Sequence, residues 1–167
     1  MTPGIVLGAI AIGIGGTLVL DLWNLLLKRV FGLPSLSYCL LGRWFRHLLK
    51  GKVTHDSIGA APAQRFECPV GWIAHYTIGV VFALVFVAWR SGGWLARPTL
   101  APALLYGLAT VVFPFCVMQP SFGLGIAASR SPDPTQARLK SLATHAVFGF
   151  GLYVCALVVS YVLRARA

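Results

Sequence analysis

The chain has 167 residues, of which 57% are hydrophobic and only 11% charged, and its mean hydropathy is +0.79. This composition excludes an ordinary soluble domain and makes a lipid bilayer the expected solvent. Because one helical crossing takes about 20 residues, four crossings leave no room for a soluble catalytic domain. The sequence also lacks a P-loop pattern, so we expect no energy from bound nucleotide.

Four apolar stretches are predicted to cross the membrane as helices, and they cover about residues 5–27, 70–89, 101–128 and 139–163. The first is expected to be retained, since its apolar run is too long for a signal peptide and no charged segment precedes it. The predicted fold is therefore an all-α integral membrane protein. We expect a single domain over residues 1–167, built as a four-helix transmembrane bundle.

Between the first two stretches, residues 38–50 are predicted to form an amphipathic helix at the membrane interface. Apolar residues recur there at helical spacing and basic residues occupy the other side, which is the interfacial pattern. A lid over the cytoplasmic mouth of the bundle is the alternative interpretation. The residues expected to contact the interface are Arg43, Trp44, Arg46 and Lys50.

The third stretch contains two prolines, Pro114 and Pro120. Each removes the amide that would bond a carbonyl four residues earlier, at Thr110 and Cys116. The sequence therefore predicts a kinked third helix. Broken helices often line transporter sites, whereas a plain packing kink is equally compatible with the pattern.

The distribution of Lys and Arg predicts the topology, because basic connections stay in the cytoplasm. One face carries ten basic residues, namely Lys28, Arg29, Arg43, Arg46, Lys50, Lys52, Arg65, Arg130, Arg138 and Lys140. The other face carries Arg90, Arg97, Arg164 and Arg166. Both termini are thus predicted to be periplasmic. Since this rule accounts for the net charge of +10, we expect no nucleic-acid partner.

The cysteines show no metal-finger spacing and no Cys-x-x-Cys pair. Cys39 and Cys68 fall on the predicted cytoplasmic face, where stable disulfides are rare. Cys116 and Cys155 are interpreted as small buried apolar residues.

Each predicted span carries an interior polar residue, and the four are Asp21, His75, Gln119 and His145. When the helices are threaded antiparallel, these residues fall at one depth in the cytoplasmic half. A carboxylate in hydrocarbon costs roughly 2.5 to 3.5 kcal/mol on insertion scales, so such residues usually face the protein interior or water. We therefore predict a shared polar layer, supported by Thr17, Asn24, Cys116 and Pro120.

Two chemistries suit this layer. Two imidazoles and a carboxylate can relay protons, because histidine titrates near neutral pH. Asp21, His75 and His145 could instead bind a divalent metal such as zinc. A structural ion pair or hydrogen bond of Asp21, and ordinary buried histidines, are the alternatives.

Several separated motifs also resemble a known family. They are Gly15-Gly16-Thr17 through Asp21-Leu22-Trp23, Gly71-Trp72 with His75-Tyr76, Pro98-Thr99-Leu100, Met118-Gln119-Pro120 and the helix of His145. In this order they resemble the bacterial membrane family of domain of unknown function 2938. The resemblance implies a small four-helix protein of the bacterial inner membrane and supplies no established activity.

The leading functional hypothesis is a membrane protein that binds or translocates a small ion, a proton or a divalent metal, at the polar layer. Because four helices form a thin wall around a pathway, a homodimer is expected to be needed. The first alternative is a structural or assembly subunit whose polar layer fixes helix packing. The second is a metal-dependent membrane enzyme acting on a lipid-like substrate.

Overall fold

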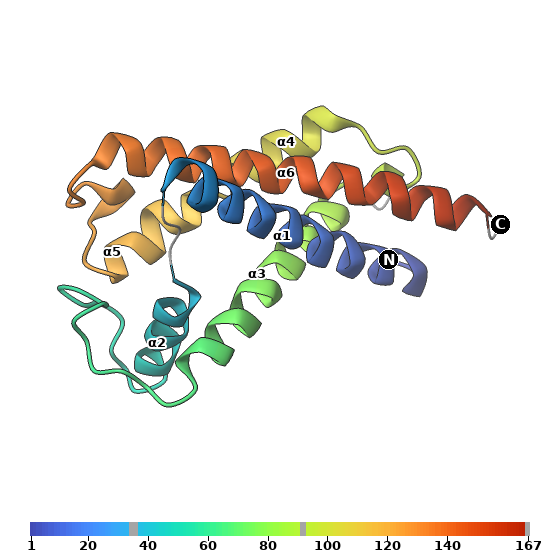
Figure 1. The fold of residues 1–167 in the computed structure, drawn as a ribbon. Helices are drawn as coiled ribbons and strands as arrows, with labels where there is room; N and C mark the ends of the chain where they lie inside the picture. The colour runs from blue at the N-terminus through green and yellow to red at the C-terminus, as the bar shows by residue number, and fades with distance from the viewer. Residues whose placement is uncertain (34–36, 91–92, 166–167) are drawn as a thin grey trace. The chain divides into compact units, whose positions relative to one another are not determined.

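The computed structural model describes residues 1–33, 37–90 and 93–165, so Arg166 lies outside the described residues. The longer helices are α1 (Pro3–Phe31), α2 (Tyr38–Leu48), α3 (Glu67–Trp89), α4 (Leu100–Ala109) and α6 (Pro134–Ala165) (Figure 1). Shorter turns are η1 (Gly93–Leu95), the π-helix η2 (Pro114–Met118), α5 (Gln119–Ser121) and η3 (Ile126–Ala128). No strand occurs in these ranges. The all-α fold class is confirmed.

Four helical stretches are long and apolar enough to cross a membrane in the described chain: Pro3–Phe31, Glu67–Trp89, Leu100–Ser121 and Pro134–Val162. Their lengths of 29, 23, 22 and 29 residues exceed the requirement of about 20. The four predicted crossings are therefore confirmed as candidate spans. Bilayer contact follows from them, because long apolar helices need an apolar solvent.

The third span is broken, as its prolines predicted, but it ends earlier than residue 128. α4 stops at Ala109, and the chain resumes as the π-helix and α5 up to Ser121. Gly123 and Gly125 then adopt positive φ values of 88° and 73°, which ends the helical path. Apolar composition continues past this point, which explains why hydropathy alone placed the boundary too late.

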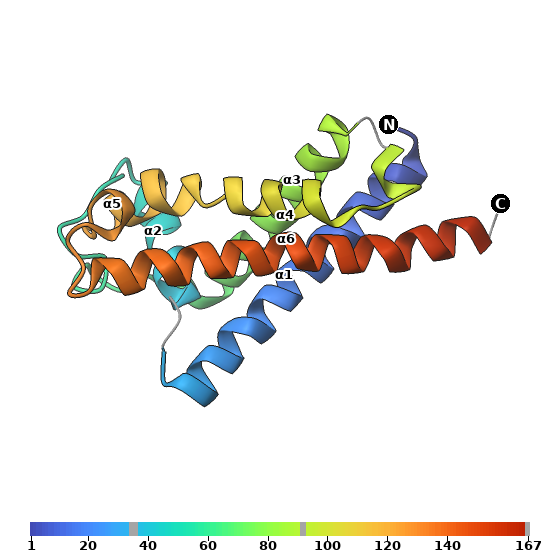
Figure 2. The same cartoon turned by 90° about the horizontal axis from the view of Figure 1, so that it is seen from above.

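The start of α6 follows a local capping rule. The Asp133 Oδ1 atom accepts a 2.9 Å hydrogen bond from the amide of Gln136, and Pro134 is the first helical residue. An acidic cap with proline at the first position is a typical helix start. Figure 2 shows α6 as one long helix without the break seen after α4.

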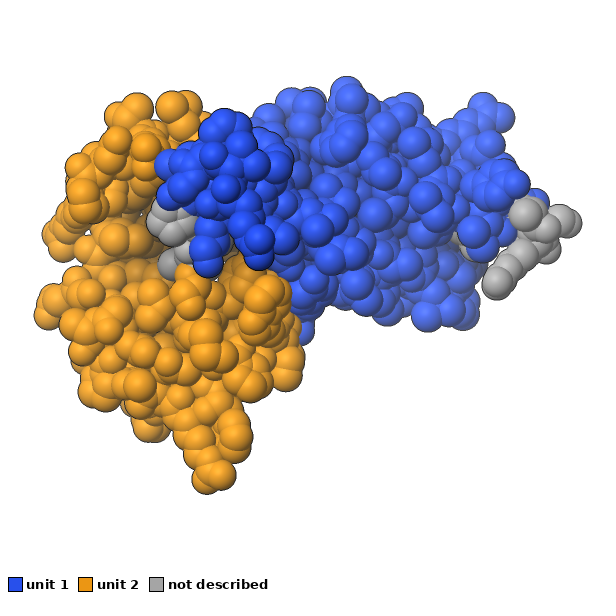
Figure 3. Space-filling view, viewed as in Figure 1, with its two compact units in different colours: residues 1–34, 76–110, 144–167 blue, residues 35–75, 111–143 orange. Residues whose placement is uncertain are grey.

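The chain forms two compact units, coloured separately in Figure 3. Unit 1 comprises Met1–Pro34, Tyr76–Thr110 and Thr144–Ala167, and unit 2 comprises Ser35–His75 and Val111–Ala143. α3 and α6 thus each contribute to both units. The prediction of a single domain stays a prediction.

Unit 1 has an apolar core in which helix backbones approach closely at glycine. A Cβ atom on Gly149 of α6 would lie 2.5 Å from the carbonyl oxygen of Ala103 in α4. A Cβ atom on Gly13 of α1 would lie 2.7 Å from the Cα of Val80 in α3. Small residues are what membrane helices use to pack closely. The core around these contacts includes Ile12, Phe86, Phe148 and Leu152, all nearly fully buried.

Unit 2 is built around the amphipathic helix α2, whose existence is confirmed, although it ends at Leu48 instead of residue 50. Its apolar face joins a second core of Leu41, Trp44, Ile58 and Phe122. The connection after α2 is tied to the last residue of α5 and the residue after it by two backbone hydrogen bonds. They run from the His55 amide to the Ser121 carbonyl and from the Ile58 amide to the Phe122 carbonyl, at 3.0 and 3.2 Å.

Candidate functional site

Asp21 lies on α1 and contacts α3 within unit 1. The Tyr76 hydroxyl donates a 3.1 Å hydrogen bond to its Oδ2 atom. One turn earlier on α1, Thr17 is 1% exposed, and a Cβ atom on Gly79 would lie 1.9 Å from the Thr17 Oγ1. The Thr17 hydroxyl itself donates to the Gly13 carbonyl at 2.8 Å. The close approach at Gly79 therefore sets the helix register that brings the phenol of Tyr76 to the carboxylate.

His145 on α6 is hydrogen-bonded to α4, also within unit 1. The Thr110 Oγ1 atom lies 2.8 Å from the His145 Nδ1 atom and 2.5 Å from the Gly107 carbonyl oxygen. A hydroxyl has a single proton to donate. If that proton goes to the Gly107 carbonyl, the Nδ1–H of His145 donates to Thr110, which fixes one tautomer of a neutral ring.

His75 belongs to unit 2, where it stacks on an aromatic side chain of α2. The rings of His75 and Tyr38 have centroids 4.0 Å apart and planes inclined by 21°. Trp72 meets the same tyrosine edge-on at 4.6 Å. His75 is thus part of an aromatic cluster that joins α2 to α3.

Gln119 directly follows the π-helix and is 6% exposed. Its Nε2 atom donates a 3.4 Å hydrogen bond to the Ser141 hydroxyl of α6, while its Oε1 atom has no hydrogen-bond partner in the described chain. The backbone N–H of Gln119 donates a hydrogen bond to the Pro114 carbonyl, five residues back. π-Helical turns are rare and often mark functional positions. A buried carbonyl oxygen beside such a turn can accept a proton donor or a small cation.

Two of the four sequence-predicted residues, Asp21 and His145, thus belong to unit 1, and the other two, His75 and Gln119, belong to unit 2. Across the described ranges, no group of three or more His, Cys, Asp and Glu side chains that could hold a metal ion is found. Convergence of all four on one layer stays a prediction, as does the divalent metal site.

Sequence reasoning missed the partners of these residues, which are Tyr76, Thr110 and Ser141. The sequence does indicate that Tyr76 and Thr110 form hydrogen bonds, since a phenol and a hydroxyl inside apolar spans need partners. Which acceptor each hydroxyl meets depends on helix register, and spacing along one helix does not encode register between two helices.

The supporting residues and cysteines named from the sequence have different surroundings in the structure. Thr17 supports the α1–α3 contact, and Asn24 is partly buried on α1. Cys116 is exposed, so its interpretation as a buried apolar residue is wrong. The π-helix widens the turn that carries Cys116, and a wider turn changes which residues face outward. Cys155 is partly buried and packs against the core of unit 1, as expected.

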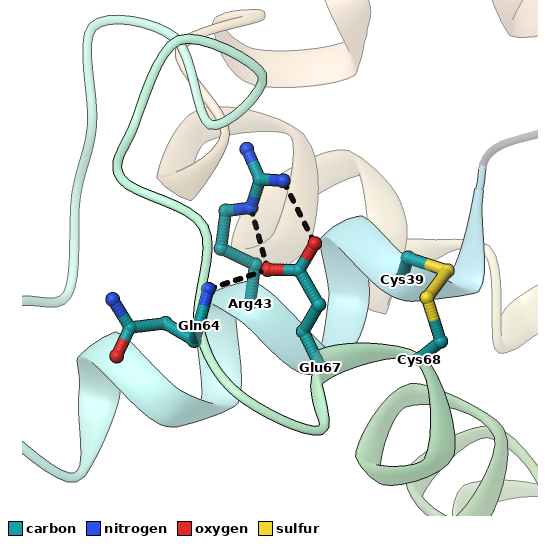
Figure 4. Close-up of a disulfide and its surroundings, with 5 residues drawn as sticks. All are labelled: Cys39, Arg43, Gln64, Glu67 and Cys68. Carbon is teal, nitrogen blue, oxygen red and sulfur yellow. Dashed lines mark hydrogen bonds and ion pairs between the residues drawn. A yellow bond between two sulfur atoms is a disulfide. The ribbon is translucent and has the colours of Figure 1, made fainter.

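A second constellation, in unit 2, was not foreseen. Cys39 and Cys68, the second residues of α2 and α3, are joined by a disulfide (Figure 4). The expectation that this pair stays unbonded is corrected by the structure. Sequence gave no indication of the bond, because the two residues are 29 positions apart and match no motif.

Beside the disulfide, Arg43 and Glu67 form a bidentate ion pair (Figure 4). Arg43 lies one helical turn after Cys39, and Glu67 directly precedes Cys68. The Arg43 Nε and Nη2 atoms lie 2.9 and 2.8 Å from the two carboxylate oxygens of Glu67. The hydrogen bond with Glu67 raises the pKa of Arg43. Its remaining nitrogen, Nη1, donates to the carbonyls of Ile58, Gly59 and Ala61. We call the disulfide Cys39–Cys68 and the ion pair Arg43–Glu67 together the clasp.

The residues predicted to contact the membrane interface include three with partners inside unit 2. Arg43 belongs to the clasp, and Trp44 is 9% exposed, with its Nε1 donating to the Val53 carbonyl at 2.8 Å. Lys50 donates to the Gln64 side chain. Membrane contact by Arg43, Trp44, Arg46 and Lys50 stays a prediction.

The apolar spans and the polar side chains within them define a multi-pass helical membrane protein. Residues 10–159 match the model of a family described as "Protein of unknown function (DUF2938)". Since this match covers most of the chain, the protein belongs to the DUF2938 family. No curated protein and no solved structure matches the chain.

Proposed function

We propose that this protein binds or passes a small cation, in the first place a proton, through the polar side chains of its membrane spans. The observation that carries the proposal is the Asp21–Tyr76 hydrogen bond of 3.1 Å between two candidate spans. A carboxylate is costly in hydrocarbon, and ionisable residues inside spans commonly belong to proton or ion pathways. Asp21 would carry the proton, and Tyr76 would hold the charged carboxylate in place.

Three further side chains support this function. In unit 1, the Thr110–His145 pair offers an imidazole with one nitrogen already engaged at 2.8 Å. In unit 2, the Gln119 Oε1 atom lacks a partner within the described residues, and His75 stacks on Tyr38. We include all four predicted positions in the proposal, with His75 and His145 as proton acceptors. A divalent metal on Asp21, His75 and His145 is the variant of the proposal for other cations.

The location is part of the same proposal. We propose the bacterial inner membrane as the location, with both termini in the periplasm, because ten basic residues fall on one predicted face and four on the other. A homodimer would provide more wall around a pathway than four helices can.

The test is a proton-flux measurement on purified protein in liposomes that enclose a pH-sensitive dye. Asp21→Asn should abolish protein-dependent flux, and Tyr76→Phe should reduce it. The matched control is Tyr106→Phe, which removes another interhelical phenol hydrogen bond of unit 1, but one whose acceptor is the Phe82 backbone carbonyl at 2.8 Å instead of a carboxylate. Equal flux in wild type and in folded Asp21→Asn would refute the proposal.

A structural or assembly role is the second candidate, because Thr17, Asp21 and His145 of unit 1 each have a hydrogen-bond partner on a neighbouring or the same helix. Such bonds fix helix register. In that case Asp21→Asn and Tyr106→Phe would both lower the thermal unfolding temperature, and liposomes would show no flux with any variant.

A further inference from the structure

The disulfide of the clasp joins two helices whose backbones are already in unusually close contact. The Cα atoms of Cys39 and Cys68 are 3.9 Å apart. Behind them, a Cβ atom on Gly42 would lie 1.7 Å from the Glu67 carbonyl oxygen, and one on Gly71 would lie 1.7 Å from the Tyr38 carbonyl oxygen. Because these glycines let α2 and α3 touch, the positions of the two cysteines do not depend on the sulfur–sulfur bond alone.

The ion pair also joins α2 to α3, close to the disulfide. Arg43 follows Cys39 by one helical turn, and Glu67 directly precedes Cys68 (Figure 4). The side chains of Arg43 and Glu67 are only 13% and 15% exposed. A bidentate, largely desolvated pair of this kind fixes geometry as well as charge. It would therefore hold both thiols in place after the disulfide opens.

The disulfide is also open to attack. Cys68 is exposed, whereas Cys39 is only partly so. Each cysteine occupies the first turn of its helix, where the helix dipole stabilises the thiolate that must leave during exchange. The predicted topology puts this connection on the cytoplasmic face. Disulfides that form there are usually transient and redox-active.

We propose that Cys39–Cys68 is a thiol–disulfide exchange site for a dithiol, and that Arg43–Glu67 keeps the two thiols in register so that the bond re-forms in the reverse exchange, in which a disulfide is the oxidant. A thiolate of the dithiol attacks the Cys68 sulfur, the disulfide breaks, and its electron pair leaves on the Cys39 sulfur. The second thiol of the dithiol then attacks the mixed disulfide and releases Cys68. The dithiol is oxidised to a disulfide, the cystine is reduced to two cysteines, and two protons pass from the dithiol to the new thiolates.

The experiment uses the full chain with Cys116→Ser and Cys155→Ala, so that only the clasp cysteines react. Purified oxidised protein is treated with dithiothreitol under folding conditions, and free thiols are counted by the mass added on maleimide labelling. We expect two labels per chain, while the far-UV circular dichroism at the labelling temperature stays that of the oxidised, folded protein. A bond that opens only in denaturant would overturn the exchange site and would leave the proton-flux result untouched.

Re-formation is tested after the dithiol is removed and a mild disulfide oxidant is added. Glu67→Gln should slow closure about tenfold, since losing a charge-assisted pair is worth about that factor. Lys50→Ala, which removes an exposed cation bonded to Gln64, should close at the wild-type rate. If Glu67→Gln closes as fast as wild type, the positioning role is wrong. Unfolding of oxidised Glu67→Gln is recorded alongside, so that a slow rate in a folded protein is the supporting result.

The state in cells gives an independent arm. Membranes from cells quenched with acid and labelled at once should contain both oxidised and reduced protein, with the reduced share rising after a reductant is added to the culture. A chain found fully oxidised under both conditions would be statically cross-linked, and the proposal would fail.

Discussion

Different interactions stabilise the interior of each of the two units. Unit 1 relies on backbone contacts at glycine and on an apolar core, with interhelical hydrogen bonds added at Asp21 and His145. Unit 2 has an apolar core and glycine contacts of its own, and adds a covalent bond, a bidentate ion pair and hydrogen bonds to a long connection. Lipid offers no hydrophobic force that would favour one apolar helix partner over another. Close packing must do that work in unit 1, whereas directed polar bonds can do it in unit 2.

The largest effect should come from breaking close packing in unit 1. In Gly149→Ala the new Cβ would lie 2.5 Å from the Ala103 carbonyl oxygen and 2.9 Å from the Leu104 Cα. Neither backbone atom can move alone, so we expect a loss of about 3 kcal/mol in the free energy of unfolding. Thermal unfolding in detergent measures it. Gly4→Ala is the control, because nothing lies within 4 Å of its Cβ, and no loss is expected there.

The next largest effect tests the polar bonds of unit 2. Arg43→Ala leaves the Glu67 carboxylate without its guanidinium and three connection carbonyls without a donor. We expect a loss of about 2 kcal/mol, seen as lowered unfolding temperature and faster proteolysis of residues 50–66. Lys50→Ala should change stability by less than about 0.5 kcal/mol. Equal effects of the two substitutions would contradict the importance given to the ion pair.

A smaller effect is expected when a single hydrogen bond of unit 1 is removed. Thr110→Val keeps the side-chain shape but deprives His145 Nδ1 of its 2.8 Å partner, which should cost about 1 kcal/mol. Thr77→Val on the exposed side of α3 is the control and should be nearly neutral. The comparison between the units would be blunted if Thr110→Val proved as damaging as Gly149→Ala.

The smallest effect concerns pH and unit 2. His55 is 7% exposed, and its burial lowers its pKa. The Ser121 backbone and the charge of Asp56 oppose that effect, and the charges of Lys52 and His47 add to it. An unfolded histidine has a pKa of about 6.5, so acid favours the unfolded chain. We expect full stability above about pH 6.5 and a gradual loss as the pH falls below it.

Hydrogen exchange of the Ile58 amide between pH 8 and pH 5 follows this loss locally, after correction for the intrinsic rate. His55→Gln should remove most of the pH dependence. A wild-type protein whose Ile58 amide becomes better protected in acid would show that the sign is wrong.

The spans were predictable because bilayer thickness and proline chemistry act on the local sequence. The break near Pro114 and the cap at Asp133 belong to the same class, since each depends on neighbouring residues. The clasp was not predictable. Cys39 and Cys68 meet only because Gly42 and Gly71 allow two helices to touch, and that pairing is a property of tertiary structure.

The candidate site was predictable in part. Apolar surroundings singled out Asp21 and His145 as residues that need partners, and the structure supplies Tyr76 and Thr110. Which hydroxyl meets which residue depends on how one helix slides along another. A depth argument locates a polar residue to about one helical turn, which is too coarse to name its partner.

The π-helix changes the direction in which the later side chains of the third span point. Each residue of an α-helix advances the direction of the side chain by about 100°, and the bond from the Gln119 amide to the Pro114 carbonyl takes in one residue more than an α-turn. Gln119 therefore points where its neighbour would point in a regular helix. A regular α-helix of the same sequence would turn the side chain of Gln119 by about 100° away from this direction, and so away from the Ser141 hydroxyl that it now meets.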